Sequence, residues 1–266
     1  MSRSPEMPVQ DFRVVIPARY GSTRLPAKPL RLLAGRPMVQ HVHAQACASG
    51  AREVIVATDH EAVAAACRAF GATVVMTDPA HASGTDRLAE VVTRFGWPES
   101  DVVVNVQGDE PLLPPANVAQ AAGLLEADAG AAIATLATPI RSLHEFLDPN
   151  VVKVVRGKNG RALYFSRAPI PWPRDSAPNG LASQSSFGTA LRHVGLYAYR
   201  VGALRRMAAW PPSPLEQVER LEQLRAMENG LAIAVAEAVV IPGPGVDTED
   251  DARAVERILA AGAQIR

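Results

Sequence analysis

Three cations stand in the short segment 17–28, directly after the apolar run 14–16. A glycine, a serine and a threonine separate them, so the segment is both flexible and rich in hydrogen-bond donors. Glycine allows backbone N–H groups to approach phosphate oxygens, and cations neutralise phosphate charge. The segment matches neither the P-loop nor the Gly-x-Gly-x-x-Gly pattern. It is therefore either a polyphosphate site or a solvated basic loop. The candidate residues are Arg19, Ser22, Arg24 and Lys28.

Two acids farther along the chain are candidates for a magnesium site. Asp109 follows the apolar segment 101–107, and Asp247 lies in the Pro/Gly-rich segment 242–248. Mg²⁺ typically uses one or two protein carboxylates together with substrate phosphates. Each acid has a plainer interpretation, as a turn acid or as the N-cap of a following helix. Taken with the cationic segment, the pair favours a metal site.

Polar residues around 83–86 and at 107 are candidates for contacts with a ligand. Ser83, Thr85 and Asp86 lie at the start of a predicted helix, so they either cap it or face a nucleotide base or ribose. Gln107 shares a strand face with Asn105 in a segment that is otherwise valine. A buried amide needs hydrogen-bond partners, and either a polar substrate or a neighbouring loop would supply them.

The second half of the chain offers groups that suit an acidic ligand. Arg167 and His193 lie near strand ends, as does Tyr197, and a cation there would bind a carboxylate. On a single helix over 214–228, Glu222 falls at the edge of the apolar face while Glu216 points away. An inward Glu222 requires a partner, either the nearby Arg225 or a ligand.

Alternating strands and helices must position these residues. In the first half, apolar β-branched runs alternate with helical segments of about ten residues, which predicts βαβ units and a largely parallel sheet. In such sheets the ligand site lies beyond the carboxyl ends of the strands. The predicted strands are 14–16, 53–58, 72–76 and 101–107, and the predicted helices are 37–49, 60–70 and 85–95.

The pattern changes after residue 150. Segments 153–156 and 161–165 flank an Asn-Gly turn and predict a hairpin, and the Pro/Gly/Ser-rich segment 168–190 predicts an irregular connection. Alternation over 192–199 predicts a strand with His193, Tyr197 and Tyr199 on one face. A helix over 214–228, a strand over 232–241 and a helix over 248–260 complete the prediction.

Length, composition and net charge limit the class of protein. The 266 residues are 48% apolar and predict one α/β domain with a flexible tail over 1–11. Lys plus Arg and Asp plus Glu both count 27, and this zero net charge argues against nonspecific nucleic-acid or anionic-membrane binding. Cys47 and Cys67 lie in helix-like segments and predict buried thiols in a reducing compartment. Since no apolar run is long enough to cross a membrane, we expect a cytoplasmic protein.

Together, these segments resemble the 3-deoxy-manno-octulosonate (Kdo) cytidylyltransferase family. The motifs Phe-Ser-Arg at 165–167, Arg-His-x-Gly at 192–195 and Leu-Glu-Gln-Leu-Arg at 221–225 are the most specific for it. The resemblance implies a Rossmann-like α/β nucleotidyltransferase fold whose central sheet is mainly parallel, with helices on both sides. It also implies a smaller hairpin-containing region, about 151–200, for substrate binding and dimerisation. The other matching segments are 16–30, 57–60, 81–87, 104–111, 213–216 and 245–248.

The resemblance also implies an activity. CTP and Kdo would give CMP-Kdo and pyrophosphate with Mg²⁺, in a homodimer that serves lipopolysaccharide synthesis. The implied catalytic residues are Arg19, Arg24, Lys28, Asp109 and Asp247, of which the two aspartates hold the metal. The implied nucleotide contacts are Ala18, Arg19, Ser22, Arg24, Lys28, Ser83, Thr85, Asp86 and Gln107. The implied Kdo contacts are Gln107, Arg167, His193, Tyr197 and Glu222.

The chain departs from the family pattern at three positions. Ala27 stands where Gly is frequent, Asp78 replaces a common Arg, and Asp86 replaces a Glu. Two other functions fit the same residues. One is a cytidylyltransferase for another acidic sugar such as sialic acid, and the other is a non-catalytic regulator that binds a nucleotide or sugar.

Overall fold

The computed structural model describes residues 11–21, 25–176 and 179–263. The predicted tail over 1–11 lies outside this part of the chain except for Asp11. Strands and helices alternate up to the middle of the chain, as predicted, because short β-branched runs are separated by amphipathic helical segments.

The strands form a mixed sheet with a parallel core. Its order is β11-β7-β10-β6-β1-β4-β5, with the β8–β9 hairpin attached to β10. Strands β6, β1, β4 and β5 run parallel, whereas β10 is antiparallel to β6, β7 and β8. The strands of this sheet are β1 (Phe12–Pro17), β4 (Glu53–Thr58), β5 (Thr73–Met76), β6 (Val102–Asn105), β7 (Ile133–Pro139), β8 (Lys153–Arg156), β9 (Ala162–Ser166), β10 (Leu191–Arg200) and β11 (Ile233–Glu237), and a separate pair consists of β2 (Leu32–Leu33) and β3 (Arg36–Pro37).

Helices cover both faces of the sheet. Side chains of α1, α2 and α4 share one apolar cluster with one face of β1, and side chains of α3, α6 and α8 share another with the opposite face. Along β1, Val14 and Ile16 point into the first cluster and Val15 into the second, as strand geometry requires. The helices are α1 (Met38–Cys47), α2 (Glu61–Ala69), α3 (Gly84–Arg94), α4 (Pro115–Ala127), α5 (Leu143–Leu147), α6 (Val201–Ala209), α7 (Pro214–Glu219), α8 (Gln223–Glu228) and α9 (Glu249–Ala263).

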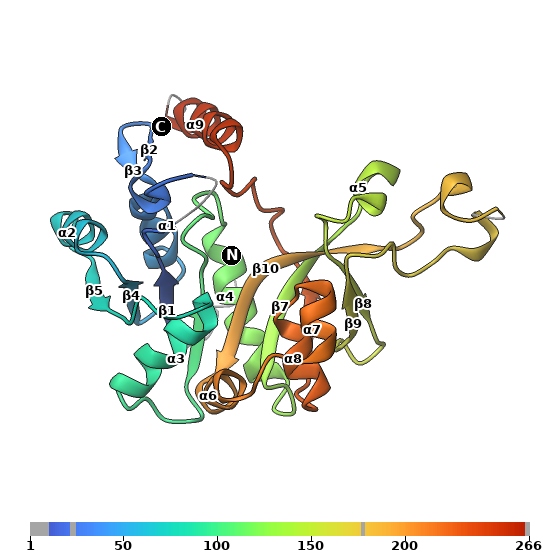
Figure 1. The fold of residues 1–266 in the computed structure, drawn as a ribbon, viewed down its shortest axis with the longest axis horizontal. Helices are drawn as coiled ribbons and strands as arrows, with labels where there is room; N and C mark the ends of the chain where they lie inside the picture. Colours follow the sequence, from blue (N-terminus) through green and yellow to red (C-terminus); the bar gives the residue numbers. More distant parts are fainter. Residues whose placement is uncertain (1–10, 22–24, 177–178, 264–266) are drawn as a thin grey trace, which may run out of the picture.

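The secondary structure elements gather toward two ends of the molecule. Figure 1 shows β1, β4, β5 and helices α1 to α3 at one end, and the β8–β9 hairpin, α5 and the 167–190 connection at the other. The antiparallel β10 runs between the two ends, and α9 returns to the side of α1 and β2. The hairpin-containing second half is thus joined to the first half through one continuous sheet.

One predicted helix is wrong. The segment 214–228 is broken into α7 and α8 at Arg220, which has a left-handed φ of 54°. The prediction used one apolar stripe, but the stripe splits at the break: Leu221 and Leu224 are buried, whereas Val218 is 81% exposed. Of the two short helices, α8 is largely buried and α7 lies at the surface.

Two smaller expectations also need correction. The strand predicted over 232–241 ends at Glu237, and side chains of α4 then bind the backbone: Asn117 pairs with Val240, and Gln120 with Glu237 and Val239. Cys67 is buried as expected, but Cys47 is exposed beside His43. In the described part of the chain, no helix has the length and apolar character needed to cross a membrane.

Candidate active site

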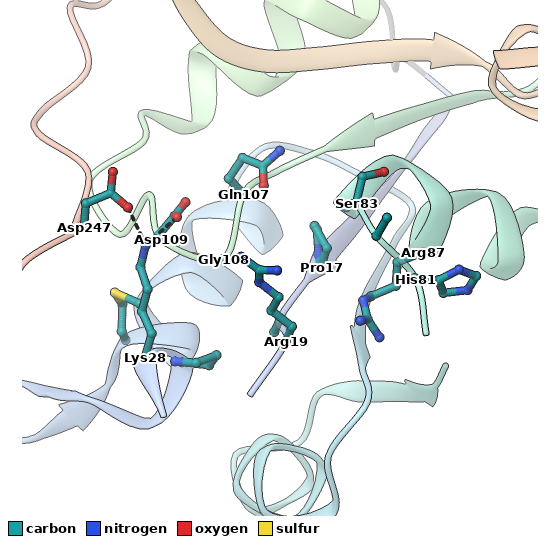
Figure 2. Close-up of a pocket in the computed structure, with 15 residues that line it drawn as sticks. Pro17, Arg19, Lys28, His81, Ser83, Arg87, Gln107, Gly108, Asp109 and Asp247 are labelled. Atoms are coloured by element: carbon teal, nitrogen blue, oxygen red, sulfur yellow. Dashed lines mark hydrogen bonds and ion pairs between the residues drawn. The ribbon is translucent and has the colours of Figure 1, made fainter. Parts of the chain in front are cut away.

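A cleft of about 340 Å³ opens at the carboxyl ends of β1 and β6. This is the edge where a parallel sheet is expected to bind ligands. Figure 2 shows side chains from the segments after β1, before α3 and after β6 converging there. Of the residues proposed from sequence, those that line the cleft are Ala18, Arg19, Lys28, Ser83, Gln107, Asp109 and Asp247.

Two loops approach each other closely at the floor of the cleft. A Cβ on Gly108 would lie 2.7 Å from the carbonyl oxygen of Pro17, so only glycine fits there. The backbone N–H of Val106 also donates to the carbonyl of Val15, which keeps the end of β6 against β1. This contact brings Asp109 to the same side of the cleft as the cationic loop.

The ammonium of Lys28 lies between the two predicted metal acids. Its Nζ is 2.7 Å from Asp109 Oδ2 and 2.9 Å from Asp247 Oδ1 (Figure 2). Ala27, in a left-handed conformation, turns the chain into the short 3-10 helix that begins at Lys28. Burial alone would lower the pKa of Lys28, but the two carboxylates outweigh it and raise the pKa.

The two acids fit a divalent cation that is also bound by a ligand. Both carboxylates touch one cationic group, so a single ion placed there would contact both. Within the described ranges, no group of three or more His, Cys, Asp or Glu side chains is arranged to hold a metal ion. Two carboxylates plus phosphate oxygens are a typical donor set for Mg²⁺, so the site suits a metal delivered with a nucleotide.

A third carboxyl group lies beside this pair. Burial, and then the charge of Asp109, raise the pKa of Glu110 to about 7. The side chain packs against Gly245, where a Cβ would lie 2.9 Å from Glu110 Oε1. Gly245 therefore leaves room for Glu110 in the segment that carries Asp247.

The start of α3 forms another wall of the cleft. Ser83 Oγ accepts from the backbone N–H of Asp86 at 3.1 Å, and the Asp86 carboxylate accepts from the N–H of Ser83 at 3.2 Å. This reciprocal pair is a capping box, so the capping interpretation is confirmed. Contacts of Ser83, Thr85 or Asp86 with a nucleotide stay a prediction.

Glu222 connects the second half of the chain to this wall. Its carboxylate accepts hydrogen bonds from Thr85 Oγ1 at 2.8 Å and Ser83 Oγ at 3.0 Å. Arg225 Nη2 is farther, at 3.8 Å. Burial raises the pKa of Glu222. The inward Glu222 is thus partnered mainly by hydroxyls, which the sequence did not suggest.

Glu216 does not point away, contrary to the helical-wheel prediction. It binds Arg225 through two hydrogen bonds, Nη2 to Oε1 at 2.6 Å and Nε to Oε2 at 2.8 Å. The two side chains are 12% and 8% exposed. Because the chain turns at Arg220, Glu216 of α7 lies against α8, and its ion pair with Arg225 holds the two helices together.

The remaining predicted sugar-binding residues lie along β9 and β10, and none is among the described residues that line the cleft. Arg167 donates to the carbonyl oxygens of Glu219 at 2.7 Å and Pro149 at 2.9 Å. The ring of Tyr197 lies 5.2 Å from that of His193, between centroids. Burial lowers the pKa of His193 to about 3. This burial favours a neutral imidazole over the cation that the sequence suggested, and a contact of His193 with a sugar stays a prediction.

A buried ion pair at the cleft was not predicted from the sequence. Arg87 lines the cleft and donates from Nη2 to Asp59 Oδ2 at 2.9 Å, with side chains only 3% and 14% exposed. The other oxygen of Asp59 accepts from the backbone N–H of Tyr20 at 3.0 Å. The pair therefore fixes the loop that carries Arg19. The sequence feature that could have indicated this pair is Arg87 itself, which falls on the apolar face of the helix predicted over 85–95.

His81 is a second cleft residue to which the sequence gave no role. Its Nε2 lies 2.7 Å from Glu90 Oε2, and Glu90 also accepts from the backbone N–H of Asp78 at 2.9 Å. Asp78 itself accepts from the N–H of Ala80 at 2.7 Å. The residue that replaces the common arginine thus stabilises the 78–81 turn. The predicted phosphate contacts Ser22 and Arg24 lie outside the described residues.

Known proteins resemble this chain in sequence and in fold. A family model described as "Cytidylyltransferase" matches residues 13–233. A 3-deoxy-manno-octulosonate cytidylyltransferase of Thioalkalivibrio sulfidiphilus is 54% identical over 250 residues, covering 94% of this chain and 99% of that protein. One of the same name from Cellvibrio japonicus is 55% identical over 254 residues, with the same coverage.

A solved structure is similar over the whole fold. It is described as CMP:2-keto-3-deoxy-manno-octonic acid synthetase complexed with CTP, and it superposes with a TM-score of 0.85 at 43% sequence identity. The match covers 95% of this chain and 99% of that one. The predicted α/β architecture with a mainly parallel central sheet is confirmed by this likeness.

Proposed function

The chain belongs to the 3-deoxy-manno-octulosonate cytidylyltransferase family, and we propose that its cleft transfers CMP from CTP to the 2-hydroxyl of Kdo. The Kdo oxygen forms a bond to the α-phosphorus, the bond from that phosphorus to the bridging oxygen breaks, and pyrophosphate leaves with the electron pair. The hydroxyl proton passes to solvent. The products are CMP-Kdo and pyrophosphate.

The observation that carries this proposal is the Asp109–Lys28–Asp247 arrangement beside Arg19 at the edge of the sheet. Transfer of a phosphoryl-type group depends mainly on positioning and on neutralising charge. Lys28 and Arg19 would bind the phosphates that leave, with Ser22 and Arg24 as further predicted contacts. Asp109 and Asp247 would hold Mg²⁺, which neutralises phosphate charge when bound.

The wall at the start of α3 suits the nucleoside, and the adjoining second half suits the sugar. Ser83, Thr85 and Asp86 are proposed to face the base and ribose. Glu222 contacts two of these residues and comes from the second half of the chain, which supports a sugar site adjacent to the nucleotide. The proposed Kdo contacts are Gln107, Arg167, His193, Tyr197 and Glu222. His193 would take part as a hydrogen-bonding neutral ring.

The metal assignment is tested by replacing each acid with its amide. Asp109→Asn and Asp247→Asn should each reduce turnover at limiting Mg²⁺ by at least 100-fold, because one of two protein ligands loses its charge. Asp250→Asn is a matched control, since Asp250 is 93% exposed near Asp247 and lines no part of the cleft. Near-normal turnover in either of the first two variants rules out that residue as a ligand.

We also propose a homodimer that acts in lipopolysaccharide synthesis. Large exposed apolar side chains on the hairpin, the 167–190 connection and α7 support a dimer surface, since such groups often mark interfaces. They are Leu163, Trp172, Leu181, Leu215 and Val218. Two free cysteines, Cys47 and Cys67, support a reducing compartment such as the cytoplasm.

A further inference from the structure

Lys28 occupies the position that the metal ion would need. Its ammonium makes contacts of 2.7 Å and 2.9 Å with one oxygen each of Asp109 and Asp247. Mg²⁺ binds carboxylate oxygens at about 2.0–2.1 Å, so an ion that contacts both oxygens would fall where the ammonium now lies. The lysine and the ion therefore compete for the same acceptors.

A lysine can leave this position, but only if it finds another anion. The Lys28 side chain is 12% exposed, and an ammonium that is mostly buried is costly without a partner. Its stem has four rotatable bonds, and Lys28 lines the same cleft as Arg19. The oxygens of a polyphosphate in that cleft are acceptors that the ammonium reaches without leaving the site.

We propose that Lys28 is a placeholder cation that excludes divalent metal from the free protein and releases the two aspartates when CTP arrives. The inference rests on the proposed metal and nucleotide sites. CTP withdraws the ammonium toward its phosphates, and the metal takes its place against the oxygens of Asp109 and Asp247 that Lys28 contacted. Metal and nucleotide then bind with positive coupling, and by linkage each raises the affinity for the other by the same factor.

The test measures Mn²⁺ binding by electron paramagnetic resonance, a readout that does not depend on turnover. In the absence of nucleotide, Lys28→Met should bind Mn²⁺ at least ten-fold more tightly than the wild-type chain. Lys158→Met is the matched control, since it removes the same charge from an exposed position in the hairpin turn and should leave Mn²⁺ affinity unchanged. Lys28→Gln should behave like Lys28→Met and guards against a folding defect in one variant.

The second part of the experiment adds CTP but no Kdo. The signal of Mn²⁺ bound to CTP alone is measured in a protein-free sample and subtracted. CTP should raise the Mn²⁺ affinity of the wild-type chain at least ten-fold and that of Lys28→Met by clearly less. Adding Asp109→Asn to Lys28→Met should remove its nucleotide-free binding, which locates the ion at this pair.

Two results would overturn the inference in distinguishable ways. If the free wild-type chain binds Mn²⁺ as tightly as Lys28→Met, and Asp109→Asn abolishes it, the metal site stands and the placeholder role is wrong. If neither protein binds Mn²⁺ even with CTP, the metal site itself is wrong.

Discussion

The buried pair of Arg87 and Asp59 gives the sharpest prediction about stability. Arg87→Met leaves the Asp59 carboxylate, 14% exposed, without its cation. Breaking a buried ion pair by removing one partner costs about 3–5 kcal/mol. For a protein of this size that corresponds to a fall in melting temperature of roughly 6–20 °C.

Arg68→Met provides the matched control. Arg68 pairs with Glu61 at 2.6 Å, but these side chains are 51% and 68% exposed. A surface pair of this kind contributes about 0–1 kcal/mol. Both variants lose one positive charge, and urea unfolding followed by circular dichroism compares them. If Arg87→Met is destabilised no more than Arg68→Met, the reasoning from burial is refuted.

The same pair should also affect nucleotide binding. Asp59 accepts from the backbone N–H of Tyr20, one residue after Arg19. Fixing one residue's backbone costs about 1–2 kcal/mol, so releasing this contact should weaken CTP binding by roughly 5–30-fold. Titration of CTP by calorimetry on folded Arg87→Met protein measures this. Unchanged CTP affinity would show that the pair does not position the loop.

Other predictions follow from single contacts. Gly108→Ala should cut turnover at least ten-fold, because its Cβ would lie 2.7 Å from a backbone carbonyl oxygen. Gly195→Ala is the control and should keep normal turnover, because its Cβ would meet no atom within 4 Å. Pyrophosphate release measures the turnover of both variants. Arg225→Met should destabilise the fold by about 3–5 kcal/mol in urea unfolding, since Glu216 would remain buried without its cation. The pKa of His193 is about 3 in the folded chain and about 6.5 in the unfolded chain. Between these two pH values the unfolded state binds more protons than the folded state, so the free energy of unfolding falls as the pH drops. Denaturation at pH 7 and pH 5 should show about 2 kcal/mol of this loss, which His193→Gln removes.

The sequence predicted the structure best where a local residue pattern is enough to determine it. The run at β1, the alternation in β10 and the acid after β6 follow from β-propensity, strand periodicity and the ligand edge of a parallel sheet. The predicted faces of β10 are confirmed, since Val194, Leu196 and Ala198 pack in one cluster and Tyr197 and Tyr199 in the other.

The sequence failed where tertiary contacts decide. The break at Arg220 is stabilised by the Glu216–Arg225 pair, which reaches across the turn and is invisible to a helical wheel. Similarly, the Asp59–Arg87 pair joins residues 28 positions apart, and Glu222 meets Thr85 across 137 positions. Such partners depend on how the sheet brings distant segments together.

The central claim is that the cleft transfers CMP from CTP specifically to Kdo. The most direct measurement is pyrophosphate release from CTP and Mg²⁺ with Kdo or, in parallel, with sialic acid as the acceptor. We expect rapid release with Kdo, formation of CMP-Kdo in equal amount by mass spectrometry, and little release with sialic acid. Silence with Kdo, or faster release with sialic acid, would contradict the account.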